Sequence, residues 1–421
     1  MGPRIGPRYW AVRQTSDVVI AGAGIAGIAT AWQIALRLGA TTAVLVDPRP
    51  PLSLTSDRPG ANYRDWWPQA SMVALADRSI ALTEGLLADG AAFGMNRRGY
   101  LYVTADPATA TRLPEVIARH LAAGVAPQDA DLLGPTDVSA RFPHLATDLL
   151  GAIHARRAGS LDTVGLGRAM LAIAQARGVT VVRGAVIATT VAKDRITGVT
   201  ISTPAGDVTI ATRRFINASG PFVRDLARRL DVEIPLETVL RQKVLIRDPL
   251  EIVPRDAPFT IGLDRTGDQP AGVHIKPDGS TMDDTVKLGW ARDQTPSEPI
   301  VDQPCPHEFP MEVLARAATI VPGLGAYLDR PPRIVAHDGG FYARTPDGLP
   351  VIGPLGMDGA YVVGALAGFG SMMACAAGEL AAAWVLGERL PHLAGDFDPR
   401  RFRESTRWGH RLEGVQPAGE L

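Results

Sequence analysis

The sequence predicts an α/β protein in which a discontinuous nucleotide-binding domain is combined with an α+β domain built on a mostly antiparallel sheet. Three observations predict this fold class. A glycine-rich βαβ pattern occupies residues 17–47, similar strand patterns return near 179–220 and after 334, and residues 236–290 mostly alternate between apolar and polar types. Alternation with a period of two is typical of a half-buried antiparallel sheet. We therefore expect separate stretches of the chain to build one nucleotide-binding domain.

Hydrophobic periodicity predicts the individual elements. Apolar residues at helical spacing predict helices, and strict alternation predicts strands. The predicted helices run over 77–93, 107–123, 163–177, 221–230, 311–320 and 371–386. Strands are predicted within 99–106, 178–191, 195–203 and 206–220, and the Pro-rich residues 296–310 are expected to form a loop.

The composition is that of a globular chain without a broad surface of one charge. Of the 421 residues, 46% are hydrophobic and 21% charged, and 43 Lys and Arg nearly balance 44 Asp and Glu. This balance argues against a nucleic-acid or anionic-membrane surface. Two cysteines, Cys305 and Cys375, and eight scattered histidines give neither a disulfide framework nor a metal site. We expect no metal, nucleic-acid or membrane partner, and a monomer or homodimer. We expect a cytoplasmic location, because no apolar run of signal-peptide length opens the chain.

The strongest motif is "DVVIAGAGIAGIATAWQIALRLGATTAVLVD", residues 17–47. Gly22 lets the chain turn, Gly24 lets the backbone approach a pyrophosphate, and Gly27 lets the helix pack on the strand. The free N–H groups at the helix start favour phosphate, and Asp47 can accept hydrogen bonds from ribose hydroxyls. The candidate nucleotide-binding residues here are Gly22, Gly24, Ile25, Ala26, Gly27 and Asp47. The motif fits NAD or FAD, but an NAD enzyme usually continues as a compact run of β-α units, which this chain leaves at 48–68.

Five stretches in order carry a family resemblance. The chain resembles the D-amino acid oxidase superfamily of FAD-dependent oxidoreductases, and within it the sarcosine oxidase and N-methyl amino acid oxidase branch. The resemblance covers nearly the whole chain. It rests on the opening βαβ unit, on "LTSDRPGANYRDWW", on "VVRGAVIA" followed by "RRFINASGPF", on "TVKLGW", and on "GGFYARTPDGLPVIGP" followed by "VVGALAGFGSMMACAAGEL".

The resemblance implies a division into domains. Residues 1–75, 150–225 and 334–395 would form the discontinuous Rossmann-like FAD-binding domain. Residues 76–149 and 226–333 would form the substrate domain, and residues 396–421 a C-terminal tail.

The resemblance also implies how FAD is held. Val186 would hold the adenine through its backbone, and Thr55 and Ser56 would reach the ribityl chain or the phosphates. The helix that starts near Ser371 would aim its positive end at the flavin N1–C2=O edge, which becomes anionic on reduction. The further cofactor-binding candidates, which lie where the backbone would approach the dinucleotide or the flavin, are Gly220, Gly340, Gly368, Gly370 and Met372.

Two positions depart from the family pattern. Gly340 stands where the covalent-flavin branch has a cysteine, so we expect FAD to be bound non-covalently. Met372 stands where sarcosine oxidase-like enzymes have a second carboxylate-binding lysine. The substrate could therefore also be an amine without a carboxylate, or an amino acid whose carboxylate is held in another way.

The resemblance implies four residues at the substrate. Arg64 would bind a carboxylate, for which a planar guanidinium is suited. Tyr342 and His274 would line the substrate pocket. Lys287 alternates with Val286, Leu288 and Trp290, so it points to the opposite face of its strand. It matches the lysine that the family places above the flavin, where an ammonium stabilises charge developing on O2.

The implied reaction is oxidation of a C–N bond of an amine or amino acid. A hydride equivalent would pass to flavin N5, the imine would hydrolyse to a carbonyl compound, and O2 would reoxidise the flavin to give H2O2. Two alternatives stay open: a dehydrogenase of the same fold that uses an electron carrier, and a biosynthetic tailoring flavin oxidase that acts on a larger intermediate.

Overall fold

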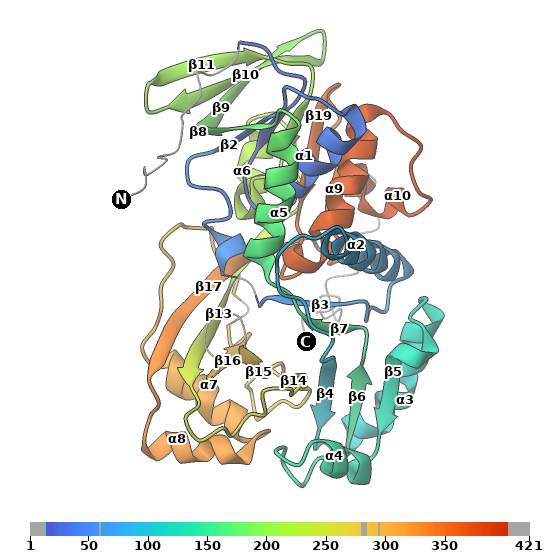
Figure 1. The fold of residues 1–421 in the computed structure, drawn as a ribbon, viewed down its shortest axis with the longest axis vertical. Helices are drawn as coiled ribbons and strands as arrows, with labels where there is room; N and C mark the ends of the chain where they lie inside the picture. The colour runs from blue at the N-terminus through green and yellow to red at the C-terminus, as the bar shows by residue number, and fades with distance from the viewer. Residues whose placement is uncertain (1–13, 59, 279–283, 294, 403–421) are drawn as a thin grey trace.

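A six-stranded sheet organises the upper half of the molecule in Figure 1. The computed structural model describes residues 14–58, 60–278, 284–293 and 295–402. The sheet order is β18-β19-β12-β1-β2-β8, and only the β18–β19 pair is antiparallel. Its strands are β1 (Val19–Ala21), β2 (Val44–Asp47), β8 (Thr180–Arg183), β12 (Phe215–Asn217), β18 (Val351–Pro354) and β19 (Ala360–Gly364). Three separate stretches of the chain therefore meet in one sheet.

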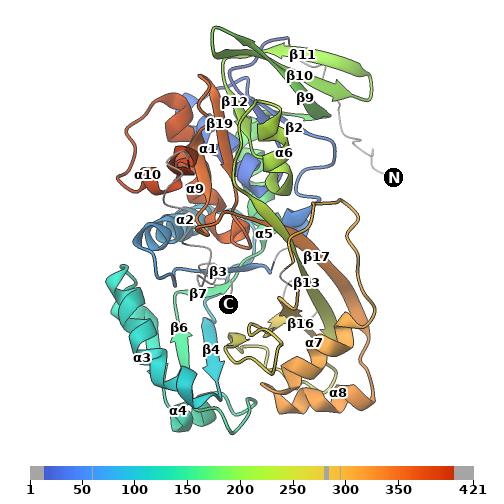
Figure 2. The ribbon, with the colours of Figure 1, turned by 180° about the vertical axis from the view of Figure 1, so that it is seen from behind.

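The two faces of this sheet pack against different layers. Apolar side chains such as Ile20 and Leu45 pack on one face with α1 (Ile25–Leu38), α5 (Thr163–Ala176) and α9 (Gly370–Leu386). A Cβ at Gly378 of α9 would lie 2.5 Å from the carbonyl carbon of Ala29, which shows how closely α9 approaches α1. The other face packs against α6 (Val223–Arg228), which Figure 2 shows from behind, and against the antiparallel sheet of β9 (Ala185–Ala192), β10 (Arg195–Thr203) and β11 (Gly206–Ala211).

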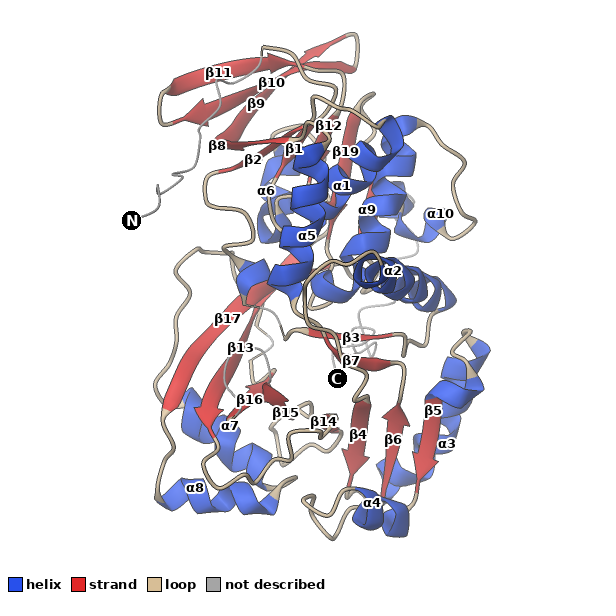
Figure 3. Ribbon diagram, viewed as in Figure 1, coloured by secondary structure: helices blue, strands red, loops and turns tan. Residues whose placement is uncertain are grey.

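An eight-stranded sheet forms the lower half. Its order is β17-β13-β16-β15-β14-β4-β6-β5, and every pair except β14–β4 is antiparallel. Figure 3 shows it curving from β17 on one side to β5 on the other. The strands are β4 (Tyr100–Thr104), β5 (Ala130–Leu133), β6 (Gly151–Ala155), β13 (Glu237–Arg247), β14 (Phe259–Gly262), β15 (His274–Asp278), β16 (Thr285–Trp290) and β17 (Ile334–Arg344).

Helices cover the outer face of this sheet. Val286, Leu288 and Trp290 of β16 are buried together with apolar residues of α7 (Phe309–Ala318), as their alternation predicts. The remaining elements are the ribbon of β3 (Asn62–Arg64) with β7 (Ala158–Ser160), and α2 (Ala70–Ala88), α3 (Pro107–Ala122), α4 (Pro135–Arg141), α8 (Ala326–Asp329) and α10 (Ala394–Phe397).

The predicted fold class is confirmed: the protein is α/β, with a mostly parallel sheet and a second, mostly antiparallel one. One predicted helix differs in its bounds. The helix expected over 77–93 runs from Ala70 to Ala88, since Gln69 has extended backbone and the helix begins directly after it. The domain boundaries given above stay a prediction. Among the described residues, no helix is long and apolar enough to cross a membrane.

Candidate active site

A cavity of about 420 Å³ opens at the carboxyl ends of β1 and β2, where ligands bind in open α/β sheets. The first residues of α1 and α9 help to line it. Ten of the predicted cofactor residues lie in its wall: Gly22, Gly24, Ile25, Ala26, Asp47, Thr55, Ser56, Val186, Gly220 and Gly370.

Glycine is needed at three positions of the first turn, each for a different steric reason. Gly22 has φ of 107°, and a Cβ there would lie 2.3 Å from the Ala218 carbonyl oxygen. Gly27 is outside the described cavity wall, and its Cβ would lie 2.0 Å from the Gly22 carbonyl oxygen. Gly24 has only the Ser56 hydroxyl nearby, at 3.2 Å from its Cβ position, so its backbone stays open to a ligand.

The polar groups at this end suit a phosphorylated nucleotide. The Ile25 N–H donates to Ser56 Oγ at 3.0 Å, and the first turns of α1 and α9 contain no acidic residue to compete with an anion. Asp47 accepts hydrogen bonds from the backbone N–H groups of Ala23 and Arg49, each at 2.9 Å. These bonds fix the carboxylate and leave further lone pairs for ribose hydroxyls.

The connection that leads into α9 is held in an uncommon conformation. Ala365 and Ala367 have φ of 51° and 43°, which costs on the order of 1–3 kcal/mol for a residue with a side chain. Ala367 N–H donates to the Ala343 carbonyl at 3.0 Å, and a Cβ at Gly368 would lie 2.3 Å from the Tyr342 ring. The backbone is thereby fixed against β17, in the wall between this cavity and a second one.

The second cavity, of about 120 Å³, adjoins the first across β17. Phe341 and Ala343 line the large cavity, whereas Gly340 and Tyr342 line the small one. This division follows from the alternation of side chains along a strand. Seven predicted site residues lie in the wall of the small cavity: Arg64, His274, Gly340, Tyr342, Gly368, Ser371 and Met372.

Arg64 is enclosed by aromatic rings. Its side chain is 3% exposed, Nη1 donates to the Tyr102 hydroxyl at 2.5 Å, and the guanidinium carbon lies 4.5 Å from the Trp67 ring centroid. The ring centroids of Tyr100 and Phe369 lie 5.6 and 5.8 Å from the same carbon. Cation–π contacts and the hydroxyl hold the guanidinium in a poorly solvated place, where it can attract an anion strongly.

His274 is a neutral group of the same wall. Burial lowers the pKa of its imidazole to about 4, with a contribution from nearby Lys276 and Lys287, and Nδ1 lies 3.0 Å from the Gly272 carbonyl oxygen. A Cβ at Gly289 would lie 2.1 Å from Nε2, so the neighbouring strand needs glycine there. At neutral pH His274 therefore offers hydrogen bonding without charge.

Lys287 is buried but lies outside the described walls of both cavities. It is 7% exposed, and its Nζ lies 3.6 Å from Asp278 Oδ1. Burial lowers the pKa of the ammonium, and Asp278 opposes that shift. The structure thus places the residue on the inner face of β16, as its alternation predicts, and behind the small cavity.

Two further lysines on this face were missed by sequence reasoning. Lys276 pairs with Lys287 across β15 and β16 and is 3% exposed. Lys243 of β13 lines the small cavity and forms an ion pair with Asp338. Their places on alternating strands were the available signal, but only the pairing of the strands brings the three lysines together.

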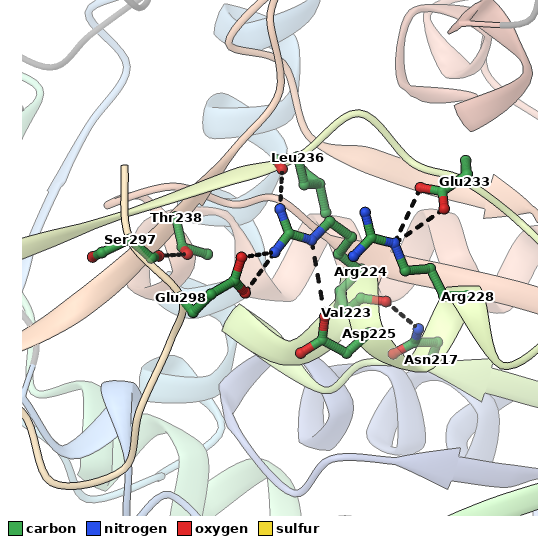
Figure 4. Close-up of polar contacts among 10 residues, drawn as sticks. All are labelled: Asn217, Val223, Arg224, Asp225, Arg228, Glu233, Leu236, Thr238, Ser297 and Glu298. Carbon is green, nitrogen blue, oxygen red and sulfur yellow. Dashed lines mark hydrogen bonds and ion pairs between the residues drawn. The ribbon is translucent and has the colours of Figure 1, made fainter. Parts of the chain in front are cut away.

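The loop after β16 reaches across to the nucleotide side. Figure 4 shows Glu298 accepting two hydrogen bonds from Arg224 Nη2 of α6, both at 2.6 Å. Ser297 N–H donates to the Thr238 carbonyl at 2.8 Å, and Val301 lines the large cavity. The loop thus covers part of that cavity and is tied to both halves of the molecule.

A nucleotide cavity at the sheet end, with a second cavity across one shared strand, is the arrangement of a dinucleotide-dependent oxidoreductase. The chain belongs to the DAO family of FAD-dependent oxidoreductases, whose family model matches residues 17–384. The predicted superfamily and FAD cofactor are therefore confirmed, and the described residues of the large cavity fit FAD. Membership of the sarcosine oxidase branch stays a prediction. Non-covalent attachment of FAD stays a prediction. It rests on Gly340, which has no thiol that could form a covalent bond to the flavin.

Several solved structures share the fold. L-proline dehydrogenase from P. horikoshii superposes with a TM-score of 0.79 and 22% identity, over 93% of this chain and 99% of that one. Glycine oxidase from Geobacillus kaustophilus superposes with a TM-score of 0.77 and 21% identity, over 92% of this chain and 99% of that one. Iminodiacetate oxidase from Chelativorans sp. BNC1 superposes with a TM-score of 0.74 and 22% identity, over 91% of this chain and 98% of that one. A search of curated proteins finds no match.

Proposed function

We propose that this enzyme oxidises a C–N bond of an amine or amino acid in the small cavity and uses O2 as the final electron acceptor. The observation that carries the proposal is Arg64, a buried guanidinium in an aromatic wall of the cavity that adjoins the FAD cavity. The named activities of proteins with the same fold, on proline, glycine and iminodiacetate, support this substrate class.

Bound FAD supplies the acceptor for a hydride equivalent. The chain's own residues bind and orient the substrate. Arg64 pairs with a carboxylate, Tyr342 limits the position of the substrate beside β17, and neutral His274 offers a hydrogen bond. Loss of the C–H hydrogen with its electron pair converts the neutral amine into an iminium ion, and loss of the N–H proton to solvent gives the imine. Addition of water then gives a carbonyl compound and a free amine. The aromatic walls exclude bulk water while the C–H bond breaks.

Oxygen use rests on the positive charge behind the cavity. Transfer of one electron to O2 gives superoxide, an anion that a fixed ammonium in a poorly solvated place stabilises. We assign this role to Lys287, acting through its field from behind the cavity wall. The products with O2 would be H2O2 and the imine.

A second candidate is a dehydrogenase that passes electrons to a carrier. The Lys287–Asp278 pair favours it, because the carboxylate offsets the field of the ammonium. A tailoring oxidase for a larger intermediate is the third possibility. The proposed domain boundaries, the cytoplasmic location and the monomeric or dimeric state accompany these proposals as predictions.

One experiment tests the function and separates the first two candidates. The holoprotein is mixed anaerobically with N-methyl amino acids, D- and L-amino acids and cyclic amines, and loss of the oxidised flavin absorbance is followed. The reduced protein is then mixed with air-saturated buffer. Flavin reduction by at least one amine is expected, with reoxidation in seconds for an oxidase and in minutes for a dehydrogenase. Absence of reduction by every amine would contradict the proposal.

A further inference from the structure

The small cavity is unusually basic. Among the described residues in its wall, four are cationic and none is acidic; the four are Arg58, Arg64, Arg241 and Lys243. The aromatic residues Tyr100, Phe259, Tyr342 and Phe369 belong to the same wall. Cations in apolar surroundings interact strongly with anions, since water screens them poorly.

These cations belong to two separate places. Arg64 lies on β3 against Trp67. Arg241 and Lys243 are alternate residues of β13 and pair with Gly340 and Asp338 of β17. The cavity therefore has one basic position on β3 and another on β13.

Arg58 belongs to the second position. It directly follows the 3-10 turn Thr55–Asp57, and a Cβ at Gly340 would lie 3.0 Å from Thr55 Cγ2. Burial, the charge of Lys287 and then the charge of Arg58 lower the pKa of Lys243 to about 7. Within the described parts of the chain no ion pair is formed by Arg58, whereas Lys243 pairs with Asp338. Arg58 is thus a half-buried cation that faces a cavity and has charge to offer a ligand.

The face behind the cavity adds to the same potential. Lys276 and Lys287 lie there with Asp278 as a shared acidic neighbour; burial lowers the pKa of both, and the charge of Lys287 lowers that of Lys276 further. A positive field of this kind favours carboxylates and disfavours a protonated amine. It therefore selects a substrate with a neutral amine and more than one anionic group.

We propose that the substrate is a small amine dicarboxylate, with one carboxylate on Arg64 and the second on the basic position formed by Arg58, Arg241 and Lys243. This inference rests on the proposed function, because it assumes that the small cavity is where the amine is oxidised. The C–N bond between the two carboxylates then lies beside Tyr342 and β17, next to the FAD cavity.

Binding of non-oxidisable acids to the FAD-loaded protein tests the inference without turnover. Difference absorbance of the flavin and tryptophan fluorescence are followed during titration with glutarate and with its monoamide, which has the same shape and one charge fewer. Glutarate is expected to bind about ten-fold more tightly or better, with a preference that falls as salt increases. Equal dissociation constants for the two ligands would overturn the inference, whether or not any variant folds.

Variants of Arg58 test whether the second carboxylate binds at the position formed by Arg58, Arg241 and Lys243. Arg58→Gln is expected to remove most of the preference for glutarate over its monoamide, whereas Arg112→Gln, at an exposed position of α3, leaves the preference unchanged. A preference that survives Arg58→Gln in full contradicts the assigned place.

Anaerobic reduction by oxidisable amines separates failure of the inference from failure of the function. Iminodiacetate and N-methylglycine are compared as reductants of the flavin. Faster reduction by iminodiacetate at low concentration supports the inference, and equal reduction by both overturns it while the function stands. If neither acid nor any other amine reduces the flavin but glutarate still binds preferentially, the anion site stands and the proposed reaction is wrong.

Discussion

Lys287 and Asp278 form a buried ion pair behind the small cavity, with 3.6 Å between Nζ and Oδ1 and side chains that are 9% and 6% exposed. The strands that carry them, β15 and β16, are adjacent in the eight-stranded sheet. The pair fixes where the ammonium lies and also reduces its field at the cavity. Oxygen reactivity should therefore depend on both residues.

Lys287→Met is expected to leave anaerobic flavin reduction largely intact and to slow reoxidation by air about 100-fold, because the positive charge is lost. The measurement is stopped-flow absorbance of the reduced protein mixed with oxygenated buffer. The single variant also removes one of the two ammonium groups near the buried Asp278, so some loss of stability is expected as well.

The double variant Lys287→Met/Asp278→Asn controls for that instability. It should recover thermal stability while reoxidation stays slow, and Asp278→Asn alone should speed reoxidation. Wild-type reoxidation in a folded double variant would show that Lys287 has no part in the oxygen reaction.

Arg64→Lys tests the carboxylate contact while keeping a positive charge. A lysine cannot pair bidentately with a carboxylate or stack as a planar guanidinium on Trp67. The KM for a carboxylate-bearing amine should rise about 10–100-fold, since each 1.4 kcal/mol of lost binding is tenfold. Cyclic amines without a carboxylate serve as the matched substrates, and their kinetics should change much less. An equal loss for both substrate types would assign Arg64 a structural role.

Lys276 acts on the site through the strand that carries Arg64. Its Nζ donates to the Ala61 carbonyl at 3.0 Å, to Asn62 Oδ1 at 2.8 Å and to Ser160 Oγ at 3.2 Å, and so joins β15 to the β3–β7 ribbon. Lys276→Met leaves these acceptors without their donor, at a cost of about 1–3 kcal/mol for each buried group. We expect a lower Tm and a KM for carboxylate substrates that rises more than kcat falls.

The exposed Lys193, in the turn between β9 and β10, provides the control for Lys276. Lys193→Met should change neither the Tm nor the KM. If Lys276→Met lowers the Tm but leaves the KM for carboxylates unchanged, the lysine stabilises the ribbon without positioning Arg64.

Asp65 makes stability depend on pH. It is 3% exposed, and burial raises the pKa of its carboxyl to about 7, against partial compensation by Arg157 at 3.9 Å. The folded state holds a proton between pH 4 and 7 that the unfolded state has released, so stability falls as pH rises through this window. A shift of about three units corresponds to at most about 4 kcal/mol.

Thermal unfolding of the holoprotein at pH 5 and pH 8 measures this effect. Asp65→Asn should raise the Tm at pH 8 relative to the wild type and have little effect at pH 5. Asp89→Asn, at an exposed position after α2, should show no such difference. A benefit of Asp65→Asn that is equal at the two pH values would contradict the assignment of the titration to Asp65.

The nucleotide side of the molecule could be predicted from the sequence to a large extent, because its signals are local. Gly22, Gly24 and Asp47 lie within one βαβ unit whose steric needs are written in a short motif, and the structure places all three at the large cavity. The alternation around Lys287 likewise predicts its face. Each of these inferences needs only neighbouring residues.

The basic character of the small cavity could not be predicted in the same way. Arg241 and Lys243 are neighbours on one face of β13, but Arg58 lies in a loop much earlier in the chain and joins them only because Thr55 packs against Gly340 of β17, the strand next to β13. The burial of Lys276 likewise depends on the β3–β7 ribbon, which is formed by residues almost 100 positions apart. A periodic pattern gives the face of a strand and leaves its neighbours and register open.

The Arg224–Glu298 pair gives a prediction about retention of the cofactor. Glu298 ties the loop that carries Val301 to α6, beside the large cavity (Figure 4). The Glu298 side chain is 72% exposed, so the pair is worth only about 0.2–1 kcal/mol to stability. Glu298→Gln should therefore barely change the Tm, yet it should speed FAD release about two- to five-fold, because opening of the loop loses that free energy. The rate is measured from the rise of flavin fluorescence after dilution.

Glu233→Gln breaks the Arg228–Glu233 pair on the same helix without touching the loop, and should leave the release rate unchanged. Equal release rates for the wild type and both variants would mean that the loop does not control access to the cofactor.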